Sequence, residues 1–146
     1  MDMAPTFHML LYRAFHAQRN ALRPHLGELG LGAGQPKILG YLIQNGSSRQ
    51  RQLAEYCEVD PAAISRMLDS MQKGGFVLRQ GDEQNRRCEQ IVVTERGREA
   101  YGAWQGFCRE MEEQMLTGFS DQERAQFADY LSRAYRNLKE GGESGA

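Results

Sequence analysis

The sequence lacks the marks of several large classes of protein. Its three cysteines are scattered and form no CxxC pair, so reduced thiols in a cytosolic protein are the simplest interpretation. No apolar run is long enough to cross a membrane, and no basic stretch leads into an apolar core near the N-terminus. We therefore expect neither a membrane partner nor a secretion signal, and we expect a cytoplasmic location.

The chain also lacks an excess of positive charge. Its 18 basic residues are balanced by 19 acidic ones, for a net charge of −1, whereas nucleic-acid-binding domains are often basic. Lysine is scarce, so most of the basic residues are arginines, which suit phosphate and guanine recognition better. A GC-rich genome explains the same bias equally well. Any binding to DNA must therefore depend on the local placement of charge.

Motifs of enzymes and metal centres are missing as well. The chain has no Ser-His-Asp order, phosphate loop or nucleotide fingerprint. His8, His16 and His25 are 8 and 9 residues apart, so no two of them lie one helical turn apart on the same face. We expect no metal, no cofactor and no enzymatic activity.

What is present is the composition of one globular domain, with 40% hydrophobic and 25% charged residues among 146. Apolar periodicity and capping residues predict a fold that is mainly α with a small β-hairpin wing. Pro24 is expected to kink or end the first helix. The predicted helices cover 5–26, 36–46, 49–56, 61–73, 95–119 and 120–138, and the predicted strands cover 76–80 and 90–94.

The segment 48–75 has the pattern of a helix-turn-helix. Ser47 or Ser48 can cap its first helix, and Asp60 followed by Pro61 is a strong signal for the start of the second. Two short helices joined by a tight link, the second strongly capped, are typical of this motif. Because a hairpin follows, the sequence predicts a winged helix.

Several short motifs occur in a fixed order between residues 52 and 97. It comprises Leu53-Ala54, Gly75-Phe76-Val77, Arg79, Asp82, Arg86-Arg87 and Thr94 through Gly97, and 35-QPKIL-39 precedes it. This order resembles the MarR family of bacterial transcription regulators, over about residues 10–138. The departures are Asn85, where the family usually has an aspartate that fixes the neighbouring arginine, and Ala62 and Ala63, where small hydroxyl residues are common.

The resemblance implies a single domain, 1–146, with a winged helix-turn-helix DNA-binding region at about 36–97. N- and C-terminal dimerisation helices at about 1–33 and 98–140 would flank it, and 141–146 would form a flexible tail. Family members are homodimers that bind near-palindromic operators in double-stranded DNA, and many release the DNA when a small, often aromatic, effector or an oxidant binds. We expect a homodimeric, sequence-specific repressor.

The predicted helix at 61–73 has an apolar inward stripe and a second, outward face. Arg66 on that face is the best candidate for a guanine or phosphate contact, with Ser65 on a phosphate or base edge; an ordinary solvated face is the alternative. Arg49 and Arg51 can hold phosphates or be plain surface charge. The predicted DNA contacts outside the hairpin are Arg49, Arg51, Ala62, Ala63, Ser65 and Arg66.

Arg86 and Arg87 are predicted to lie at the tip of the hairpin, where a guanidinium can enter a narrow minor groove. A solvated tip is the alternative, and the residues do not indicate which of the two would enter. Asn85 can orient a guanidinium by hydrogen bonding but without charge. Cys88 is placed to switch the wing if oxidised, although only the two arginines nearby favour its thiolate.

Five aromatic residues either line an apolar pocket for an effector or belong to the core. They are Phe7, Tyr12, Phe15, Tyr41 and Trp104. Two other functions stay open: a winged-helix protein-interaction module that has lost DNA binding, which the neutral net charge and Asn85 allow, and a redox-sensing regulator that uses Cys88.

Overall fold

The computed structural model describes the backbone of residues 3–82 and 85–144 and the side chains of residues 3–81 and 89–141. The described chain is mainly helical with an antiparallel hairpin, as the sequence predicts. Contacts divide it into two compact units, residues 1–111 and 112–146. The elements in chain order are α1 (Phe7–Leu29), α2 (Gln35–Asn45), α3 (Gln50–Cys57), α4 (Pro61–Lys73), β1 (Val77–Asp82), β2 (Asn85–Val93), α5 (Glu95–Met115) and α6 (Asp121–Ser144).

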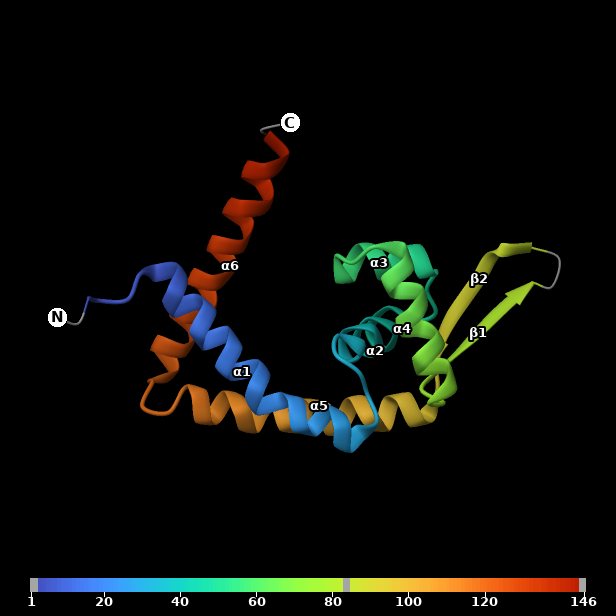
Figure 1. The fold of residues 1–146 in the computed structure, drawn as a ribbon, viewed down its shortest axis with the longest axis horizontal. Helices are drawn as coiled ribbons and strands as arrows, with labels where there is room; N and C mark the ends of the chain where they lie inside the picture. Colours follow the sequence, from blue (N-terminus) through green and yellow to red (C-terminus); the bar gives the residue numbers. More distant parts are fainter. Residues whose placement is uncertain (1–2, 83–84, 145–146) are drawn as a thin grey trace. The chain divides into compact units, whose positions relative to one another are not determined.

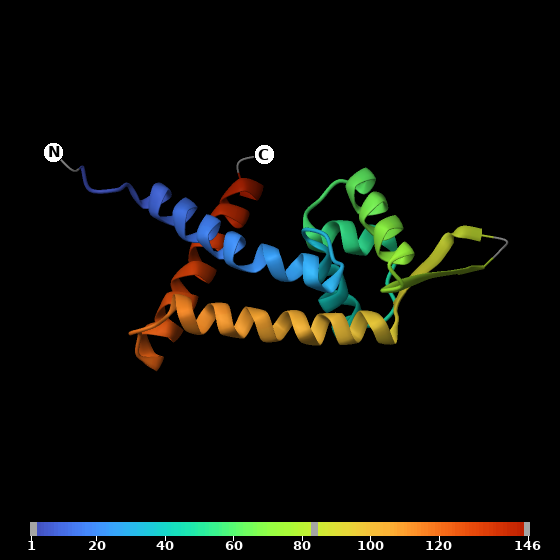
Figure 2. The same ribbon diagram turned by 60° about the horizontal axis from the view of Figure 1, so that its bottom comes forward.

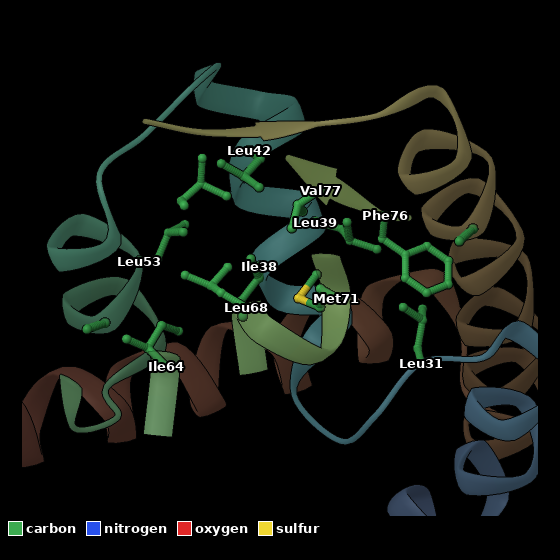
Figure 3. Close-up of a cluster of buried hydrophobic side chains, with 13 residues drawn as sticks. Leu31, Ile38, Leu39, Leu42, Leu53, Ile64, Leu68, Met71, Phe76 and Val77 are labelled. Carbon is green, nitrogen blue, oxygen red and sulfur yellow. The ribbon is translucent and has the colours of Figure 1, made fainter. Parts of the chain in front are cut away.

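Helices α2, α3 and α4 and the base of the hairpin enclose the hydrophobic core (Figure 1, Figure 3). In Figure 3 the side chains of Ile38, Leu68 and Met71 meet near its centre. Each leucine-sized side chain removed from water contributes about 1.5–3 kcal/mol, so this core fixes the direction in which α4 presents its other face. The fully buried side chains are Ile38, Leu39, Leu42, Leu53, Ile64, Leu68, Met71, Val77 and Ile91.

The start of α4 is confirmed. The Asp60 carboxylate accepts a hydrogen bond from the Ala63 backbone N–H at 2.8 Å, and Pro61 occupies the first helical position. Pro61 has no N–H to lose there, and its fixed φ suits a helix. At the other end the chain leaves the helix through Gly74 and Gly75; Gly75 has a φ of +82°, which favours glycine.

The start of α3 differs from the prediction, because the N-cap is Arg49 and not Ser47 or Ser48. Ser48 forms a bridge to the hairpin: its N–H donates to the Ile91 carbonyl at 3.1 Å, and its carbonyl accepts from the Ile91 N–H at 2.7 Å. Because this bridge holds Ser48 in extended backbone, the helix begins later. The Gln52 side chain then accepts from the Arg49 N–H at 2.8 Å.

Helix α5 starts directly at the base of the hairpin. Thr94 Oγ1 donates to the Gly75 carbonyl at 2.6 Å and accepts from the Gly97 N–H at 3.0 Å, so Thr94 caps this helix. The Thr94 N–H donates to the Phe76 carbonyl at 3.0 Å. Gly97 fits here because it has no side chain: a Cβ at this position would lie 2.3 Å from the Phe76 carbonyl oxygen.

Helix α1 continues past Pro24 to Leu29, so the proline does not end it. A proline inside a helix removes one backbone hydrogen bond, and contacts around it offset that loss. The His25 ring stacks on Phe107 of α5, with centroids 3.8 Å apart. The C-terminal half of α1 lies beside α5 in both views of the ribbon (Figure 1, Figure 2). The helix ends at Gly30, whose φ of +78° stops it.

In the second unit, α5 ends at Met115, earlier than the predicted 119, and Gly118 with a φ of +87° makes the turn. A capping box opens α6: the Ser120 N–H donates to Glu123 at 2.8 Å, and the Glu123 N–H donates to the Ser120 hydroxyl at 3.1 Å. Across the turn, the Arg124 guanidinium is 2.8 Å from the carboxylate of Glu113.

Helix α6 extends to Ser144, into the predicted flexible tail at 141–146; residues 145–146 lie outside the described residues. Glycine costs about 1 kcal/mol in a helix relative to alanine, which is not enough to end a helix of this length at Gly141. The apolar stripe of α6 is exposed, and Leu138 reaches 82% exposure. Within the described ranges, no helix combines the length and apolar character needed to cross a membrane.

Candidate nucleic-acid interface

The face of α4 opposite the core carries the predicted contact residues. Ala62 and Arg66 are exposed, whereas Ala63 and Ser65 are half-buried. Among the residues that the structure describes, Arg66 has no ion-pair partner. Its guanidinium therefore keeps its hydrogen-bond donors available, on a helix that the core and the Asp60 cap hold in place.

Arg49 and Arg51 lie at the start of α3, and both are exposed. Arg51 Nε is 3.3 Å from the Glu55 carboxylate, one turn further along the helix. An exposed pair of this kind contributes about 0–1 kcal/mol and exchanges readily for another anion. Arg49 forms no ion pair with a described residue. Both side chains are thus accessible to a phosphate group. Arg49 can bind one directly, whereas Arg51 must first release Glu55.

A third arginine, Arg79 of β1, lies against α4. Its guanidinium is 2.7 Å from the Asp69 carboxylate and 3.0 Å from the Gln72 side-chain oxygen, and it is 3.5 Å from the Ser65 carbonyl. Sequence reasoning counts Arg79 in a motif but gives it no role in the site. Strand alternation offers a signal, because Arg79 shares the inward face of β1 with the buried Val77, where a charged side chain needs an acceptor.

The hairpin arginines do not lie in the loop at the tip. The strands extend further than predicted, with Asp82 paired to Asn85, and the backbone of Arg86 and Arg87 belongs to β2. The longer ladder takes these residues into the strand because each further pair adds backbone hydrogen bonds. The side chains of residues 82–88, including Cys88, lie outside the described residues.

The five candidate pocket residues are not joined by ring contacts within the described chain. Phe7, Tyr12 and Phe15 of α1 are exposed, and Trp104 of α5 is half-buried. Tyr41 of α2 is half-buried, and its described ring partner is Tyr56 of α3, at 4.7 Å between centroids. These positions place the aromatic residues on three separate helices.

The two cysteines whose side chains are described, Cys57 and Cys108, are half-buried. Burial raises the pKa of the Cys57 thiol because it disfavours the thiolate, and the nearby Lys37 only partly opposes this effect. In the described residues no three His, Cys, Asp or Glu side chains come together as a metal site. His25 instead pairs with Glu28, at 3.3 Å.

Comparison with known proteins gives consistent results. The MarR family model matches residues 32–88. The helix-turn-helix transcriptional regulator YybA of Bacillus subtilis (strain 168) is 28% identical over 112 residues, which cover 77% of this chain and 75% of that protein. A crystal structure of MarR has a TM-score of 0.81 and 28% identity over 98% of both chains. A MarR-family regulator from Silicibacter pomeroyi has a TM-score of 0.73 and 27% identity, covering 89% of this chain and 88% of that one.

Proposed function

Because this chain belongs to the MarR family of transcriptional regulators, we propose that it represses transcription as a homodimer bound to a near-palindromic operator in double-stranded DNA. The observation that carries the proposal is the exposed Arg66 without an ion-pair partner among the described residues, on a rigidly anchored α4. The proposal includes a single functional domain, 1–146, that acts in the cytoplasm, where operator DNA is found.

In this proposal α4 enters the major groove. Its buried stripe fixes the helix, so Arg66 reaches outward and can donate two hydrogen bonds to a guanine or bind a phosphate. Ala62 offers a methyl group to thymine methyls, and the half-buried Ala63 and Ser65 lie at the edge of the same contact. Each good base contact discriminates by about 1–3 kcal/mol.

Contacts outside the major groove give affinity rather than sequence discrimination. Arg49 and Arg51 would bind phosphates beside the groove, and Arg51 would exchange Glu55 for the phosphate. Arg86 or Arg87 of the hairpin would enter the neighbouring minor groove, where negative potential is concentrated. The chain as a whole has a net charge of −1, so the salt dependence of binding reports how many phosphates these arginines contact, and few contacts would make it shallower than for a strongly basic protein.

The exposed apolar side chains at the two ends of the chain support a homodimer. Phe7 and Leu10 of α1 and Leu131 and Leu138 of α6 are each about half exposed or more. A monomer gains nothing by holding so many apolar side chains in water, whereas a second copy would cover them. Replacing Leu131 with glutamate should shift the oligomeric state toward monomer in sedimentation experiments.

The proposal also includes release of the DNA by a small aromatic effector. The side chains that we expect to contact it are Phe7, Tyr12, Phe15, Tyr41 and Trp104. Their exposed or half-buried rings leave apolar surface available to such a molecule. A screen of aromatic acids for loss of DNA binding tests this part of the proposal separately.

The main test is fluorescence anisotropy of the full-length chain on duplexes from upstream of its own gene, with scrambled duplexes as the control. We expect saturable binding to one natural duplex, and Arg66→Ala should weaken it by about tenfold or more. Arg109→Ala, which removes an exposed arginine of α5, should leave it unchanged. If no natural duplex is preferred, sites selected from random DNA are the next probe, and failure there would favour a protein-interaction module.

A further inference from the structure

Arg79 joins the hairpin to α4 through its side chain. Val77 and Ile91 at the hairpin base are fully buried, and Arg79 pairs with Ile91 across the ladder on the same inward face. The hairpin then extends away from α4 (Figure 1, Figure 2). Arg79 therefore lies next to the place where the hairpin leaves the core.

The Arg79 guanidinium spans two turns of α4. It contacts groups of Ser65, Asp69 and Gln72, which follow one another along a single helix face. The Arg79 side chain is only 19% exposed, whereas that of Asp69 is 59% exposed. The planar fork holds its donors in fixed directions spread over several acceptors, whereas the ammonium of a lysine is a compact point charge.

The same contact changes the charge that α4 presents to DNA. Asp69 follows Arg66 by three residues, so the two lie one turn apart on the helix surface. An uncompensated carboxylate there would repel phosphates. The Arg79 guanidinium at 2.7 Å compensates it and is itself occupied by Asp69 and Gln72, which leaves Arg66 as the arginine of α4 that is available to the nucleic acid.

We propose that Arg79 is a positioning residue for DNA binding. It fixes the hairpin on the recognition helix and neutralises Asp69, so that hairpin and helix meet the DNA as one surface. This inference rests on the proposed function, and it assigns to Arg79 no direct contact with DNA.

A double-mutant cycle on DNA binding tests the proposal. The variants are Arg79→Met, which keeps the apolar stem, Asp69→Asn, and the two combined; the probe is the duplex that the wild-type chain selects from random DNA. We expect Arg79→Met to weaken binding by about tenfold in the wild-type background and by about twofold in the Asp69→Asn background. The same factor in both backgrounds overturns the proposal, because Arg79 would then act independently of Asp69.

Hydrogen exchange without DNA gives a second readout. Backbone amides of residues 77–80 and 90–93 should exchange faster in Arg79→Met, while those of Ile38 through Leu42 in the core keep their protection. Unchanged exchange in the hairpin overturns the positioning role, and loss of protection in the core as well identifies a general folding role instead. If the wild-type chain selects no duplex at all, the proposed function fails, and hydrogen exchange still decides whether Arg79 positions the hairpin.

Discussion

Gly97 and Gly102 stand in the same helix, and adding a methyl group to each should change stability in opposite directions. A Cβ on Gly97 would lie 2.3 Å from the Phe76 carbonyl oxygen and 2.8 Å from Val93 Cγ2, whereas ordinary contact begins at 3.4 Å. A Cβ on Gly102 would meet nothing within 4 Å. Gly97→Ala therefore measures the effect of close packing together with that of helix propensity, and Gly102→Ala measures helix propensity alone.

The magnitudes follow from these distances. Gly97→Ala must displace the first turn of α5 from the hairpin base by about 1 Å, and overpacking of this kind costs about 1–3 kcal/mol. The clash is with backbone, which cannot rotate away, so we expect a cost at the upper end of this range, about 3 kcal/mol, and a net loss of about 2 kcal/mol after the gain of about 1 kcal/mol in helix propensity. Gly102→Ala has only the propensity gain, at most about 1 kcal/mol.

Thermal and urea unfolding, followed by circular dichroism at one fixed protein concentration, measure both changes. Concentration must be held constant because assembly shifts apparent stability. For a chain of this size we expect a Tm lower by about 6–10 °C for Gly97→Ala and higher by about 2–4 °C for Gly102→Ala. A Gly97→Ala protein as stable as the wild type would refute the close approach of α5 to Phe76.

Three further predictions concern single contacts. Asp60→Ala removes the cap of α4 and should lower the free energy of unfolding by about 1 kcal/mol in urea titrations. Asp60→Asn keeps a side-chain oxygen that can accept the same hydrogen bond, so it should lose much less stability. Equal losses in the two variants would contradict the capping role. The Arg124 guanidinium lowers the pKa of Glu113. The contact between Glu113 and Arg124 therefore stabilises the folded state fully above the ordinary glutamate pKa of about 4.3. This stabilisation is lost as pH falls through the lowered pKa of Glu113 in the folded protein. In thermal unfolding across this pH range, the Tm of Glu113→Gln should fall less on acidification than the Tm of the wild type. Parallel plots of Tm against pH for the two proteins would rule the contact out. Because burial raises the pKa of Cys57, this thiol should react with iodoacetamide more slowly at neutral pH than a free cysteine, and rates that match would contradict its burial.

Features with a local cause could be predicted from the sequence. Asp60 and Pro61 act within four residues of chain, and the structure has them as predicted. The buried stripe of α4 follows from helical spacing alone. Arg66 was identified in the same way, since a stripe that faces the core leaves the opposite face outside.

Features with a distant cause could not be predicted. Ser48 fails to cap α3 because Ile91, far along the chain, holds its backbone in a bridge. Arg79 finds Asp69 only after the hairpin has folded back on α4. The position of Arg86 and Arg87 in a strand depends on how far a ladder extends, which the polar composition of that segment does not determine.

The order of the core residues along the chain bears on biosynthesis. The core cluster that α2, α3, α4 and the hairpin base enclose draws on residues from Leu31 to Ala100, and none of its members belongs to α6. During translation every side chain of this cluster has therefore been added before the ribosome reaches Asp121, the first residue of α6. Because domains generally fold as units, N-terminal first, the winged-helix module can become compact on the nascent chain. In the homodimer proposed above, pairing of two copies through α6 would then be a later step, set by how often finished chains meet.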